Sequence, residues 1–161
     1  MVTVLNTRKT VPRFLEMEAE LPESERTLFH VRRLKWHQKT RIMYLMAEAW
    51  RQLGGVGTPT SVQDGSSLMA QMAEALGDDP RRIGNVLECL EEAVGIGIAG
   101  WDNLKDDEGE AFKAEVKDGR LTDDSLSWAE IEHLFELTLI VLEENQLTKD
   151  EGKKSKSPQD S

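Results

Sequence analysis

Apolar side chains recur every three or four residues along four stretches of the chain, which is the spacing of amphipathic helices. The first predicted helix, from Lys35 to Leu53, ends at the double glycine 54–55. Its inward face is expected to hold Ile42, Met46, Ala49 and Leu53, with Met43 and Trp50 beside them. A shorter second helix ends at Gly77 and is marked by Leu68, Met69, Met72 and Leu76. Residues 54–66 are a loop by their composition.

The third and fourth predicted helices are marked by capping residues. Asp79 can cap the third helix, Pro80 takes its first position, and Gly95 follows its end. Its apolar stripe consists of Ile83, Val86, Leu87, Leu90 and Val94. The fourth helix is predicted to begin with a capping box, in which Ser127 and Glu130 satisfy each other's backbone N–H groups.

The fourth helix carries two apolar stripes and is predicted to run to about Leu147, a length of about 30 Å. One stripe consists of Ile131, Leu134, Phe135, Thr138 and Leu142, and the other of Leu137, Ile140 and Val141. A helix that lies on a single core needs one stripe only. The second stripe therefore indicates either deep burial or a surface for a partner protein.

Three shorter segments have the pattern of strands. Residues 27–34 alternate apolar and polar side chains, residues 96–101 form a glycine-broken extended segment, and residues 112–116 are a further candidate. The predicted fold is therefore mainly α, with four helices and a short strand or a small β-hairpin element.

Length and composition predict one domain with polar ends. The chain has 161 residues, of which 39% are hydrophobic and 31% charged, and this is enough for one modest core. Residues 1–25 are expected to form an N-terminal arm, residues 26–147 a single mainly helical domain, and residues 148–161 a disordered polar tail.

Charge is distributed unevenly along the chain. The net charge is −10; residues 1–60 carry ten basic and six acidic side chains, whereas residues 61–161 carry ten and 24. The two halves could pair within one fold or, by self-association, between copies. A net acidic surface disfavours general binding to nucleic acid.

The lone cysteine, Cys89, rules out an internal disulfide, which fits a reducing compartment. The longest apolar run, Leu137 to Leu142, is much shorter than the ~20 residues of a membrane span. No secretory signal pattern is visible at the N-terminus. The chain is therefore expected to be soluble and intracellular, with no membrane partner.

Two motifs resemble ligand-binding loops but lack a required part. Residues 95–100 match the glycine pattern of dinucleotide-binding turns, yet a helix precedes them where a strand is required. Residues 104–115 align with a calcium-binding loop, but its first position is Leu104, which has no side-chain oxygen. A close-packed connection and an acidic turn around Asp106 are the simpler interpretations.

Catalytic and metal-binding patterns are otherwise missing from the sequence. His30, His37 and His133 have no neighbouring ligands at zinc-site spacing. Cys89 lies among acidic residues (Glu88, Glu91 and Glu92), which oppose thiolate formation. We therefore predict a protein that is not an enzyme, with no catalytic residues, no metal and no cofactor.

One basic cluster surrounds an aromatic residue, Trp36. It consists of Arg32, Arg33, Lys35, Lys39 and Arg41. Such a cluster could contact nucleic acid, remain a solvated face, or meet the acidic half of the chain.

Several local features together resemble the small tail assembly chaperones of long-tailed bacteriophages and prophages. A strand of the type TLFHVRRL leads into a helix, and a later helix is followed by a Gly-Trp segment. That segment is matched by Gly100, Trp101, Leu104, Asp106 and Gly109. An acidic, apolar helix then leads into a tail matched by Asn145, Leu147, Thr148, Glu151, Lys153, Ser155 and Ser157.

The resemblance implies a non-enzymatic role in virion morphogenesis in the host cytoplasm. The partners implied are the tape measure protein and tail tube subunits, which the chain would keep from aggregating. The residues predicted to contact a partner are Leu137, Ile140, Val141, Glu144 and Trp101. A second hypothesis is an acidic inhibitor that mimics DNA with a row of helix carboxylates: Glu130, Glu132, Glu136, Glu143 and Glu144.

Overall fold

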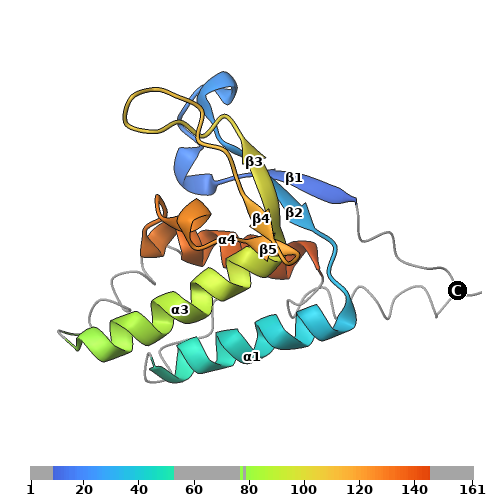
Figure 1. Ribbon diagram of the computed structural model, residues 1–161, viewed down its shortest axis with the longest axis vertical. Helices are drawn as coiled ribbons and strands as arrows, with labels where there is room; N and C mark the ends of the chain where they lie inside the picture. Colours follow the sequence, from blue (N-terminus) through green and yellow to red (C-terminus); the bar gives the residue numbers. More distant parts are fainter. Residues whose placement is uncertain (1–8, 53–76, 78, 146–161) are drawn as a thin grey trace, which may run out of the picture.

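The computed structural model describes residues 9–52, 77 and 79–145. The predicted second helix near residues 68–76, the loop 54–66 and the polar tail lie outside these residues. The described helices are α1 (Trp36–Gln52), α3 (Pro80–Gly97) and α4 (Ile131–Glu144). Figure 1 shows them gathered on one side of a small sheet, with α3 packed against both α1 and α4.

The sheet has three antiparallel strands in the order β1-β2-β3. They are β1 (Thr10–Phe14), β2 (Leu28–Arg32) and β3 (Ile98–Asp102). In β2 the alternation predicted from the sequence holds, because Phe29 and Val31 are fully buried while Leu28, His30 and Arg32 are partly exposed. A separate hairpin joins β4 (Val116–Lys117) to β5 (Arg120–Leu121), and both residues of its tight turn, Asp118 and Gly119, have positive φ.

The prediction of a mainly α fold with four helices is wrong. The described residues form three helices, a three-stranded antiparallel sheet and a two-stranded sheet. One missed strand, β1, lies within the segment predicted to be an arm, and it contains Pro12. Proline is tolerated there because β1 is an edge strand, so its nitrogen need not donate to a neighbour.

Helix α1 and the start of α3 were predicted correctly. Asp79 accepts a hydrogen bond from the backbone N–H of Arg81 (3.0 Å), and Pro80 is the first helical residue. The predicted end at Gly95 is wrong, because α3 continues to Gly97 and β3 begins at the next residue. Gly95 and Gly97 are buried in the helix, where they allow neighbouring backbone and side chains to approach closely.

The close approach at Gly97 gives a test of the packing between α3 and α4. A Cβ at Gly97 would lie 2.5 Å from both Cγ atoms of Val141, so Gly97→Ala is expected to lower the free energy of unfolding by about 1–3 kcal/mol. Adding Val141→Ala should recover part of that loss. Gly84→Ala in the same helix is the control, because nothing lies within 4 Å of its Cβ; it should stabilise slightly. Equal effects at Gly84 and Gly97 in urea titrations would contradict this packing.

The start of α4 differs from the predicted capping box at Ser127 and Glu130. Glu130 is the N-cap, and its backbone N–H donates to Nδ1 of His133 (3.1 Å). The hydroxyl of Ser127 instead donates to the carbonyl of Asp124 (2.7 Å) and closes a 3-10 turn, Asp124–Leu126. The helix therefore begins at Ile131, because the residues before it are used by this turn.

Candidate functional site

The second apolar stripe of α4 is part of the core. Leu137, Ile140 and Val141 are all fully buried, because α3 packs against one side of α4 and β2 lies against another. The sheet supplies the second layer that helices alone could not provide. These three predicted contact residues are therefore not on the surface of the described fold.

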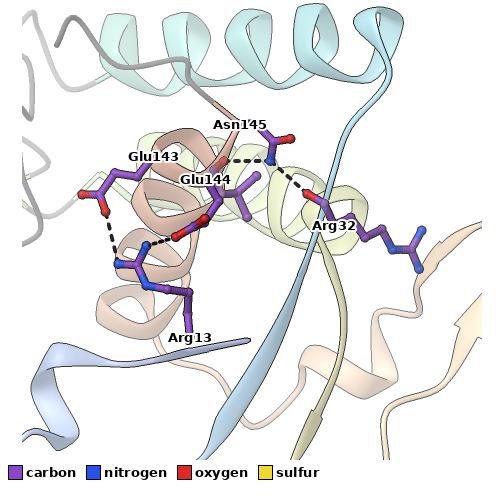
Figure 2. Close-up of polar contacts among 6 residues, drawn as sticks. Arg13, Arg32, Glu143, Glu144 and Asn145 are labelled. Carbon is purple, nitrogen blue, oxygen red and sulfur yellow. Dashed lines mark hydrogen bonds and ion pairs between the residues drawn. The ribbon is translucent and has the colours of Figure 1, made fainter. Parts of the chain in front are cut away.

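Glu144, the fourth predicted contact residue, belongs to a polar network at the end of α4 (Figure 2). Its Oε1 accepts a hydrogen bond from Arg13 of β1 (2.5 Å), and Glu143 accepts a second one from the same guanidinium (3.2 Å). The two carboxylates lie on either side of Arg13. Because both are ion-paired, β1 is tied to α4 by charge as well as by packing.

Asn145 follows these two carboxylates in the sequence and joins α4 to the connection between β2 and α1 through separate hydrogen bonds. Its side-chain nitrogen donates to the carbonyls of Arg32 and Val141, each at 3.0 Å (Figure 2). Its side-chain oxygen accepts from the backbone N–H of Leu34 (2.8 Å). One buried amide thus satisfies three backbone groups, which is a structural role.

Trp101 of β3, the fifth predicted contact residue, is part of an aromatic cluster. It is 8% exposed and meets Phe29 (6.1 Å between ring centroids) and Trp128 (5.7 Å) edge to face. Its ring stacks on Phe112, and its indole N–H donates to the carbonyl of Phe112 (2.7 Å). The Gly-Trp segment therefore anchors the chain that follows β3.

The calcium-like loop is a turn, as its composition indicated. The carboxylate of Asp106 accepts from the backbone N–H groups of Glu108 and Glu110, each at 2.9 Å. Gly109 has a φ of +81°, which favours glycine. The described residues contain no group of three or more His, Cys, Asp or Glu side chains arranged to hold a metal ion.

Most carboxylates in the acidic row of α4 make contacts within the fold. Glu143 and Glu144 pair with Arg13, and Glu136 is buried, where its carboxylate accepts from the backbone N–H groups of Glu16 (2.7 Å) and Met17 (3.2 Å). Three of the five carboxylates that suggested DNA mimicry are therefore not presented to a partner, and the geometry offers no support for that hypothesis.

Glu136 gives a pH-dependent test of this arrangement. Burial is the largest influence on its carboxyl group and raises the pKa, although the N–H groups of Glu16 and Met17 oppose the shift. The folded state therefore binds this proton more tightly than the unfolded chain does. The stability that protonation contributes is present below the unfolded pKa and is lost as pH rises through the raised folded pKa.

We expect Glu136→Gln to remove this pH dependence. Urea titrations at several pH values would measure the difference in unfolding free energy between wild type and Glu136→Gln. This difference should change with pH in the acid range and be constant above it. Exposed Glu20 provides the control through Glu20→Gln. A flat difference for Glu136→Gln across the acid range would show that its carboxyl is not perturbed by burial.

The exposed apolar side chains of the described fold concentrate on one face of α1. This α1 outer face consists of Trp36, Thr40, Met43, Tyr44 and Ala47. Trp36 is 77% exposed, Met43 51% and Tyr44 55%. The buried side chains of the same helix, Ile42, Leu45 and Ala49, point to the opposite side. The other exposed large apolar residues among those described, Met17, Leu21 and Val116, lie outside the three α-helices.

The sequence carries a signal for this face in the spacing of three apolar residues. Trp36, Met43 and Ala47 follow the helical spacing i, i+7, i+11, which places them on one side. The sequence-based prediction instead placed Met43 beside the core and Trp36 in a basic cluster. Leu45, rather than Met46, completes the buried face, and this rotates the helix so that Met43 faces outward.

The basic cluster contains some cations that make contacts within the fold and others that make no ion pair among the described residues. Arg41 pairs with Glu92 of α3 (2.5 and 3.1 Å) and lies 5.3 Å from the ring centre of Tyr44, and this contact lowers the pKa of Glu92. Arg32 donates to the carbonyl of Gly119. Within the described part of the chain, no ion pair is made by three cations near Trp36: Arg33, Lys35 and Lys39.

Cys89 is half-buried on α3. Burial is the largest influence that raises the pKa of its thiol, and the carboxylates of Glu48, Glu92 and Glu88 add to the effect. A neutral thiol of this kind is a poor nucleophile. None of the described helices is both long and apolar enough to cross a bilayer.

Comparison with known proteins assigns no family to the chain. No family model, no curated protein and no solved structure matches it. The candidate site therefore rests on the geometry of the α1 outer face.

Proposed function

We propose that this chain is a non-enzymatic tail assembly chaperone of a long-tailed bacteriophage. In this proposal it acts in the host cytoplasm and binds the tape measure protein and tail tube subunits until they assemble. The sequence resemblance suggests the family, and the observation that carries a binding role is the exposure of Trp36, Met43 and Tyr44 on one helix face. Exposed apolar side chains gathered on one face are typical of protein-binding surfaces.

The charge of the chain suits such a role. A chaperone that holds an apolar client must stay soluble while the client is bound, and a net charge of −10 favours solubility. The client is stabilised by mass action, since the chaperone binds the state that would otherwise aggregate. No chemical step is needed.

Co-expression with a tape measure protein from the same phage genome tests the proposal. We expect the tape measure protein to stay soluble and to co-purify with the full-length chain. Trp36→Ser combined with Met43→Ser should reduce the co-purified amount at least tenfold, because two large side chains leave the contact face. Val116→Ser is the matched control, since Val116 is also exposed but lies on β4. Absence of any association with the wild-type chain would overturn the proposal.

A further inference from the structure

We propose that the α1 outer face binds an amphipathic helix whose apolar side chains are flanked by acidic side chains. This inference rests on the proposed function, because it names the chemistry of the partner segment at the same face.

The shape of the face suits a helix. Trp36 and Ala47 lie eleven residues apart on α1, which corresponds to about 16 Å, or three helical turns. A straight apolar stripe of this length matches the i, i+3/i+4, i+7 side chains of a helix laid along it. Its side chains also suit such a contact, because methionine adapts to differently shaped neighbours and tryptophan and tyrosine anchor interfaces.

The charge around the face selects the flanking residues of the partner. Lys39 is on α1, Lys35 directly precedes the helix, and Arg33 lies two residues before Lys35. Among the described residues these three cations make no ion pair. At the far end of the face, Arg51 is exposed, although it pairs with Glu48 (2.7 Å). Carboxylates beside the apolar positions of a bound helix would therefore meet cations, whereas lysines there would meet like charge.

The α-helices of a second copy of the chain fit this chemistry poorly. Its α1 carries the same cations, so two α1 outer faces would repel each other. Its α4 is acidic and apolar, but that apolar surface is buried and Glu143 and Glu144 are already paired. Its α3 presents Arg81, Arg82, Asn85 and Glu88 to solvent, and none of these is apolar.

Nucleic acid also fits less well than an acidic helix. The three cations without an ion pair lie at one end of the face. Met43 at its centre and Ala47 at its other end offer nothing to a phosphate.

The test uses two synthetic peptides of about 20 residues, long enough to form helix. Both have leucine at the i, i+3, i+4, i+7 positions; glutamate occupies the flanking positions in one and lysine in the other. With the full-length chain at low salt, titration calorimetry should show at least tenfold tighter binding of the glutamate peptide. The preference should shrink as salt is raised, because the flanking charges are exposed.

Variants identify the face and the source of the preference. Trp36→Ala should weaken binding of the glutamate peptide at least tenfold, whereas Val116→Ser should not. Lys35→Glu combined with Lys39→Glu should transfer the preference to the lysine peptide. Circular dichroism should show that each variant is folded, because Lys35 is exposed and Lys39 is half-buried.

Several results would overturn the inference. These are failure of both peptides to bind, equal affinity for both, or a preference that the double charge reversal leaves unchanged. Two further results would assign the face to another occupant. One is binding of a single-stranded DNA of about 20 nucleotides in place of the peptide, and the other is concentration-dependent self-association in sedimentation. In either case, Trp36→Ala would have to abolish the binding. Loss of tape measure binding with an intact peptide preference would reject the proposed function and keep the helix chemistry.

Discussion

Replacing Ile140 with Asp is expected to abolish the folded state. Ile140 is fully buried on α4, between α3 and the sheet, and its immediate neighbours in the stripe are apolar. An ionised carboxylate there would lose its hydration without gaining a partner, at a cost of several kcal/mol. The whole domain is expected to be stable by only about 5–15 kcal/mol. Far-ultraviolet circular dichroism and thermal unfolding would measure the loss.

Two controls separate a core effect from a charge effect. Ile140→Val keeps the site apolar and should cost about 0.5–1.5 kcal/mol. Met43→Asp introduces the same charge on the exposed side of α1, where hydration is retained, and should leave the fold intact. If the Ile140→Asp variant were folded and merely failed to bind a partner, the second stripe of α4 would be exposed, which would contradict the structure.

Trp101→Ala is expected to be the second most damaging substitution. The indole contacts Phe29, Phe112 and Trp128 and supplies the hydrogen bond to the Phe112 carbonyl. Removal of a buried aromatic ring typically costs about 3–5 kcal/mol. The loss should include local order, because the turn after β3 is held by this ring. Urea unfolding and near-ultraviolet circular dichroism would report the two effects.

A comparison of tryptophans distinguishes the core ring from the surface ring. Trp101→Phe keeps an aromatic ring but leaves the Phe112 carbonyl without its donor, so a smaller loss of about 1–3 kcal/mol is expected. Trp36→Ala should change stability by less than about 0.5 kcal/mol, because Trp36 is 77% exposed. Similar stability losses for Trp36→Ala and Trp101→Ala would contradict the assignment of one ring to the surface and the other to the core.

Periodicity predicted the elements whose packing is simple. Strand β2 has one buried face and α1 has one buried stripe, so the spacing of apolar side chains predicts both elements. The start of α3 was also predictable, since Asp79 and Pro80 act locally. These features depend on near neighbours in the sequence, and a single sequence contains that information.

Elements that depend on distant contacts were missed. Strand β1 forms because β2 is beside it, and Pro12 is allowed only at the edge of a sheet. The end of α3 was misplaced because Gly95 and Gly97 break isolated helices, whereas here they make room for Leu121 and Val141. The double stripe of α4 was ambiguous because the spacing of apolar residues in one helix does not show which elements cover it, and here α3 and β2 both do.

The segment that carries the family resemblance has a structural explanation. Trp101 is in the core, Leu104 packs against it, and Asp106 and Gly109 form the turn. These residues specify the connection after β3 and do not form an exposed contact surface. The candidate contact face is therefore identified by the exposure of its side chains and not by this motif.

The absence of a loop between α3 and β3 has a consequence for how fast a partner is recognised. Gly97 ends α3 and Ile98 begins β3, so a movement of α3 would disrupt the sheet. Helix α1 is fixed to α3 by packing and by the Arg41–Glu92 ion pair. The α1 outer face is therefore preformed before any encounter. Association should be limited by diffusion and orientation, with single-exponential kinetics and no folding step, and the lifetime of the complex should be set by its dissociation rate.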